Sequence, residues 1–67
     1  MDAKITIKMS NDAFGPTLQE GTDEVARILR KLADTLENDP YSNDLISLRD
    51  LNGNKVGEFR LVGTYGK

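Results

Sequence analysis

Apolar and polar residues alternate strictly over residues 4–9. The apolar positions are Ile5, Ile7 and Met9, and charged or hydroxyl side chains stand between them. A period of two is typical of a β-strand with one buried face, because successive side chains of a strand point to opposite sides. The pattern therefore predicts a strand over residues 4–9 that contributes one side to a core.

Residues 22–37 follow a different period, of three to four residues. Their main apolar positions share one side of a helix and are Val25, Leu29, Leu32 and Leu36. This spacing is typical of an amphipathic helix. Thr22 can act as the N-cap, because its hydroxyl can accept a hydrogen bond from a free amide of the first turn. Since Pro40 prevents further helix, we predict a helix over residues 22–37 that packs on a sheet.

Two strand-like runs flank Asn52 and Gly53 near the end of the chain. An Asn-Gly pair between apolar runs is the strongest short-range signal of a β-hairpin. We therefore predict a hairpin with strands over residues 45–51 and 54–62.

The loop of this hairpin decides which of its side chains face the helix. An even loop places Ile46 opposite Phe59, so that both lie on the face that the helix covers. A three-residue loop with a bulge at Gly53 instead pairs Arg49 with Lys55, which sets like charges opposite each other. We expect the even loop, but the residues of the turn also suit the bulged form, so both registers stay open.

The predicted elements follow one another as strand, helix, strand and strand, which indicates an α+β domain of β-α-β-β order. We expect a three-stranded, mostly antiparallel sheet in the order 2-3-1, with the helix packed on one face. A mixed sheet with the first two strands side by side is the alternative. A loop over residues 10–21 and a tail over residues 63–67 complete a single small domain over residues 1–67.

Composition narrows the range of functions. The chain has no cysteine and no histidine, which excludes a disulfide and a thiolate or imidazole metal site. Its net charge of −2 differs from the strongly basic balance of many nucleic-acid-binding domains. No apolar run approaches the ~18 residues of a membrane span. The lack of cysteine fits a reducing cytoplasm, so we expect a cytoplasmic protein. Because its acidic residues are scattered and no catalytic motif is present, we expect neither cofactor, metal nor enzymatic activity.

One helix covers only one face of the predicted sheet, so the open face is the natural place for a partner. Side chains expected there, together with Phe14 of the loop, form a candidate partner surface. Its members are Phe14, Leu45, Arg49, Leu51, Val56, Arg60 and Val62. The surface suits another protein or a second copy of this chain. The alternative is an ordinary solvated sheet face, with Phe14 buried against the edge of the core.

A nucleic-acid-binding module is the second functional hypothesis. Four basic residues are expected on the open face, namely Lys4, Lys8, Arg49 and Arg60. Sheets that bind single strands usually add aromatic side chains on which bases stack, and no aromatic residue is expected on this face. The residues therefore favour protein binding over nucleic-acid binding.

Three segments of the chain stand out together. They are Asn11-Asp-Ala-Phe14, Glu24-Val-Ala-Arg-Ile-Leu-Arg30 with Leu32-Ala33, and Leu48-Arg-Asp-Leu-Asn-Gly-Asn-Lys-Val-Gly57. In combination they resemble a group of small uncharacterised proteins encoded in phages and prophages. The resemblance implies a bacterial or phage cytoplasmic setting and carries no catalytic residues. Because small phage proteins often act by binding a host protein, we predict a non-enzymatic protein-interaction module that binds a host protein or itself.

Overall fold

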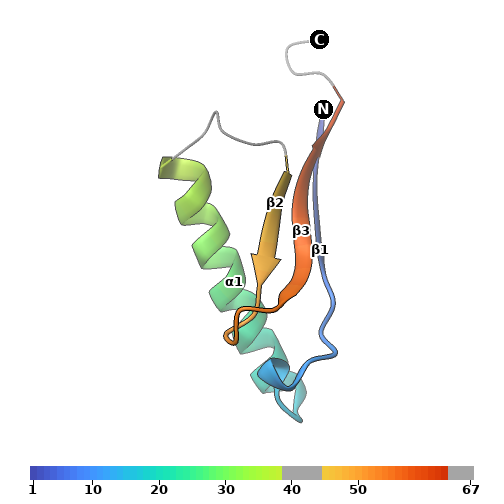
Figure 1. Cartoon of the computed structure of the whole chain (residues 1–67), viewed down its shortest axis with the longest axis vertical. Coiled ribbons are helices and arrows are strands. Elements are labelled where there is room, and N and C mark those ends of the chain that lie inside the picture. The colour runs from blue at the N-terminus through green and yellow to red at the C-terminus, as the bar shows by residue number, and fades with distance from the viewer. Residues whose placement is uncertain (39–44, 64–67) are drawn as a thin grey trace.

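The computed structural model describes residues 1–38 and 45–63. Its elements are β1 (Asp2–Ile7), the short 3-10 helix η1 (Asp12–Phe14), α1 (Leu18–Asn38), β2 (Leu45–Arg49) and β3 (Lys55–Val62). β3 lies between β1 and β2 and is antiparallel to both, while α1 runs alongside the sheet nearest to β2 (Figure 1). The predicted α+β class and strand order are confirmed, and η1 is an element that the sequence pattern did not indicate.

The helix begins four residues earlier than predicted, and Thr17 rather than Thr22 is its N-cap. The Glu20 N–H donates to Thr17 Oγ1 at 3.2 Å, and the Gly21 N–H donates to the Thr17 carbonyl at 3.1 Å. These bonds satisfy first-turn amides that would otherwise have no partner. The predicted helix stop at Asp39 and Pro40, like residues 64–67 of the predicted tail, lies outside the described residues.

Gly21 lies inside α1 because the segment after β1 approaches the helix closely there. A Cβ at this position would lie 2.8 Å from Met9 Cε and 3.4 Å from the Phe14 carbonyl oxygen. Phe14 itself is only 2% exposed and belongs to the core. The loop predicted over residues 10–21 is thus η1 followed by the first turn of α1, and Phe14 fastens it to the core instead of presenting an exposed anchor.

The turn at the tip of the hairpin is the three-residue loop with a bulge at Gly53, the less expected of the two predicted registers. The Gly53 N–H donates to the Asp50 carbonyl at 3.0 Å, and the Asp50 N–H donates to the Asn54 carbonyl at 2.9 Å. Gly53 has a φ of 87°, a left-handed conformation that glycine adopts without strain. Arg49 therefore pairs with Lys55, and the prediction of an even loop was wrong at the turn.

A second irregularity restores the register that the even loop would have produced. The pairing skips Val56, so that beyond it Leu48 faces Gly57 and Ile46 faces Phe59. One extra residue in β3 thus compensates for the odd number of residues in the turn, and Ile46 and Phe59 stay on the helix side. The bulge also carries Val56 into the core, where it is 6% exposed, so its predicted place on the open face was wrong.

The core lies between α1 and the β2–β3 half of the sheet. Its buried apolar residues are Phe14, Ile28, Leu32, Leu48, Val56 and Phe59. Ile5 and Leu29 were predicted to be part of it, but they are 48% and 38% exposed. A helix is about 10 Å wide, so a helix placed over β2 leaves the distant strand β1 uncovered (Figure 1). No helix in the described residues is long and apolar enough to cross a membrane.

Candidate protein-interaction site

The open face of the sheet carries fewer of the predicted partner residues than the sequence indicated. Leu45 faces Arg60 across the hairpin, and Val62 lies two residues further along β3. These three share one end of the face, whereas Phe14 and Val56 are buried in the core. The predicted apolar patch is therefore reduced to two exposed side chains beside an arginine.

One acidic residue on this face, Glu58, pairs with two of its cations. Glu58 accepts a hydrogen bond from Arg60 Nη2 at 3.0 Å and lies 3.7 Å from Lys55 Nζ. The hydrogen bond from Arg60 is the main reason why the pKa of the Glu58 carboxyl is lowered. Of the four basic residues predicted on this face, only Arg60 takes part in an ion pair among the described residues, so the pairing removes one of the four cations that a nucleic-acid backbone could contact.

A groove of about 440 Å³ opens instead between α1 and β2. Its apolar lining consists of Ile28, Leu32, Ile46 and Leu48, and its polar or turn residues are Arg27, Lys31, Thr35, Ser47, Arg49, Asp50, Leu51 and Gly53. Arg49 and Leu51 are the two predicted partner residues that the structure brings to this groove. Leu51 is 70% exposed at the hairpin turn, so one end of the groove carries a free apolar side chain.

Sequence reasoning missed Arg27, Lys31 and Thr35, which form the helix side of the groove. They recur every four residues and so form one row along α1, next to the buried row that contains Ile28 and Leu32. On a helix alone such a row is typical of a solvated flank. Only the offset of α1 toward β2 turns this flank into the wall of a groove.

β2 forms an edge of the sheet, and the groove follows its unpaired side. The Asp50 N–H points across the hairpin to Asn54, while the Arg49 carbonyl points the other way and accepts a hydrogen bond from Arg27 Nη2 at 3.3 Å. Successive residues of an antiparallel strand direct their backbone groups to opposite sides. The N–H and C=O groups of Leu45 and Ser47 therefore point away from β3, toward an edge at which none of the described strands is paired.

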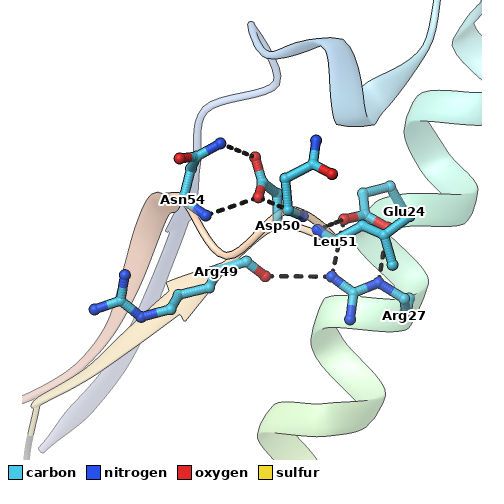
Figure 2. Close-up of polar contacts among 7 residues, drawn as sticks. Glu24, Arg27, Arg49, Asp50, Leu51 and Asn54 are labelled. Carbon is cyan, nitrogen blue, oxygen red and sulfur yellow. Dashed lines mark hydrogen bonds and ion pairs between the residues drawn. The ribbon is translucent and has the colours of Figure 1, made fainter.

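A buried carboxylate fixes one end of the groove. Glu24, only 7% exposed, accepts hydrogen bonds from Arg27 Nε at 2.8 Å, from Arg27 Nη2 at 2.9 Å and from the Leu51 N–H at 2.8 Å (Figure 2). The bond from Arg27 lowers the pKa of the Glu24 carboxyl, against the opposing effect of burial. Glu24 thus ties the helix to the hairpin turn and holds the Arg27 guanidinium at the rim.

A second buried carboxylate organises the turn itself. Asp50 accepts hydrogen bonds from Asn11 Nδ2 at 2.8 Å and from the N–H groups of Asn52 and Asn54, each at 2.9 Å (Figure 2 draws the contacts to Asn54). The bond from Asn11 is the first cause of the lowered pKa of the Asp50 carboxyl. Because Asn11 follows β1, this hydrogen bond ties the segment between β1 and α1 to the hairpin turn.

These two carboxylates predict loss of stability in acid. The pKa values of Glu24 and Asp50 are lowered from 4.5 and 3.8, so the unfolded chain binds protons at higher pH than the folded chain does. We expect the urea midpoint to be constant above about pH 5 and to fall progressively below about pH 4.5. Urea titrations by circular dichroism measure this directly. On acidification, the urea midpoint of the Asp50→Asn variant should fall less than that of the wild type. A midpoint that rises in acid would contradict the lowered pKa values of the two carboxylates.

The described residues contain no cluster of three or more histidine, cysteine, aspartate or glutamate side chains that could hold a metal ion. Comparison with protein-family models, with curated proteins and with solved structures finds no match to this chain. The resemblance to phage-encoded proteins therefore stays a prediction.

Proposed function

We propose that this protein is a non-enzymatic interaction module that receives a segment of another protein in the groove between α1 and β2. The observation that carries the proposal is the joining of an apolar groove to an edge of β2 with which no other described strand pairs. Ile46 and Leu48 supply an apolar lining, and Ser47 between them supplies outward backbone groups. A site with apolar side chains and unpaired backbone groups suits a peptide segment, because such a segment offers both kinds of partner.

The chemistry of the buried acids supports binding over catalysis. A general acid–base catalyst at neutral pH needs a carboxyl whose pKa is raised toward 7. The pKa values of Glu24 and Asp50 are lowered instead, and both carboxylates are occupied by hydrogen bonds. The resemblance to phage-encoded proteins favours a bacterial host protein as the partner and a cytoplasmic setting.

A photo-crosslinking experiment tests this function. The crosslinker p-benzoyl-phenylalanine replaces Thr35, which lines the groove, or its exposed neighbour Asp34, which does not. In irradiated bacterial cells we expect a defined adduct with another protein from position 35 and a much weaker one from position 34. Equal labelling from both positions, or no adduct from position 35, would contradict the proposal. An adduct that contains only two copies of this chain would show that the groove serves self-association and does not bind a host protein.

A further inference from the structure

We infer that the segment received by the groove is an extended, acidic peptide that pairs with β2 as a fourth strand. This inference rests on the proposed function and specifies the chemistry of the partner. Three independent features carry it, namely the edge of β2 that is unpaired within residues 1–38 and 45–63, the apolar lining beside that edge, and the charged residues that border it.

The free edge sets the backbone conformation of the partner. Leu45 and Ser47 each direct an N–H and a C=O outward, with the spacing that a neighbouring antiparallel or parallel strand requires. The next outward carbonyl, that of Arg49, already accepts a hydrogen bond from Arg27. Pairing therefore ends at the Arg49 side and extends toward Leu45, which limits the paired stretch to a few residues.

The apolar lining of the groove favours a partner with apolar side chains at alternate positions. Ile28 and Leu32 project from α1, and Ile46 and Leu48 project from the same side of β2. Ile28, Leu32 and Leu48 are already buried in the core, so every second side chain of a strand added beside β2 would mainly contact Ile46. Apolar side chains at alternate positions would then complete the half-covered edge of the core, since Ile46 is only partly buried in the free chain.

The charged residues that border the groove, here called its rim, determine which charge is favoured in a partner. Lys31 and Arg49 are exposed, and within the part of the chain that the structure describes neither takes part in an ion pair. Glu24 is occupied by Arg27, and Asp50 is buried beneath donors from three asparagines. The Arg49 side chain points away from α1, and its Nη1 donates to the Gly53 carbonyl at 3.1 Å, so its charge lies beside the hairpin (Figure 2), while Lys31 lies on the helix side of the groove. Exposed cations thus lie on both sides of the β2 edge in a chain with net charge −2. A second copy would bring a second cationic rim to the same seam, so charge favours an acidic partner over self-association.

Peptide binding tests the inference on the intact chain. The probes are fluorescent peptides of about six residues that alternate Val with Glu or Val with Lys, and a Val–Glu peptide whose alternate amides are N-methylated. We expect the Val–Glu peptide to bind, and the other two to bind at least about tenfold more weakly in fluorescence anisotropy. In NMR spectra, hydrogen exchange of the Leu45 and Ser47 amides should slow when the Val–Glu peptide binds.

Charge reversal supplies matched variants. Lys31→Glu and Arg49→Glu should each weaken the binding of the Val–Glu peptide by about tenfold. Arg30→Glu changes the same charge on an exposed helix position outside the groove and should leave binding unchanged, with the amide spectrum confirming the fold of each variant. Equal binding of the Val–Lys peptide, or equal effects of all three reversals, would overturn the acidic assignment.

Failure of the inference and failure of the proposed function give different results. If no peptide binds at about 1 mM while position 35 still crosslinks to a host protein, the partner is not an extended acidic strand, but the groove remains a binding site. If the N-methylated peptide binds as well as its parent, strand pairing is excluded and only the acidic character stands. If neither crosslinking nor peptide binding occurs, the proposed function falls as well.

Discussion

The substitution Gly57→Ala should destabilise this domain more than the same exchange at any other glycine that the structure describes. A Cβ on Gly57 would overlap the Thr6 carbonyl oxygen and would lie 2.9 Å from Ile7 Cα. Both atoms belong to the backbone of β1, so no side chain can rotate away and the strand itself must move. We expect a loss of about 3 kcal/mol, the upper end for overpacking, out of a total of roughly 3–10 kcal/mol for a domain of this size. Urea unfolding followed by circular dichroism measures the loss.

Gly53→Ala is the matched control for this prediction. Gly53 has a φ of 87°, but a Cβ there would meet nothing within 4 Å. The variant should therefore lose only about 1 kcal/mol, the conformational cost of a left-handed alanine. The two glycines separate steric exclusion from backbone strain within one hairpin. If Gly57→Ala unfolds at the same urea concentration as Gly53→Ala, β1 does not lie as close to β3 as the structure indicates.

The sequence pattern predicted the elements and their order because those depend on local periods. The alternation around Ile5 and Ile7 marks β1, and the spacing of Leu32 and Leu36 marks α1. The position of Gly21 misled the prediction of the helix start, since glycine usually interrupts a helix. Its reason is tertiary, because Met9 and Phe14 occupy the space that a side chain would need.

The register of the hairpin shows where local rules stop. The chemistry of the turn selects a bulged loop at Gly53, while burial of Ile46 and Phe59 selects the register of an even loop. Both demands are met by leaving Val56 out of the pairing, a solution that neither rule predicts by itself. The prediction of an even loop also led to an error in the candidate partner surface. Without the bulge, the alternation of side chains along the strand places Val56 on the open face.

The groove could not be predicted, since it depends on where the helix lies across the sheet. Arg49 and Leu51 were identified from the sequence as partner residues, but they were assigned to the open face of the sheet. Lys31 and Thr35 became visible as site residues only once α1 was placed over β2. In this chain the local pattern gives the parts of the site, and the lateral offset of one helix assembles them.

That offset is held by Glu24, which makes Glu24→Ala the second substitution with a large expected effect. The variant removes both hydrogen bonds from Arg27 and the acceptor of the Leu51 N–H. Breaking a buried ion pair costs about 3–5 kcal/mol when the remaining charge stays buried. Arg27 is 36% exposed and can regain water, so we expect a smaller loss of about 2–3 kcal/mol.

The neighbouring residue Asp23 provides the control, because it is exposed and its side chain accepts a hydrogen bond from Gln19 alone among the described residues. Asp23→Ala should change the free energy of unfolding by less than about 0.5 kcal/mol. The loss of unfolding free energy for Glu24→Gln should lie between those of Glu24→Ala and Asp23→Ala. Its amide oxygen can still accept a hydrogen bond from the Leu51 N–H, but it carries no charge to pair with Arg27. Equal urea midpoints for Glu24→Ala and Asp23→Ala would show that the carboxylate does not fasten the helix. If it does, Glu24→Gln should also weaken binding in the groove, because Arg27 and the hairpin turn are no longer held at its rim.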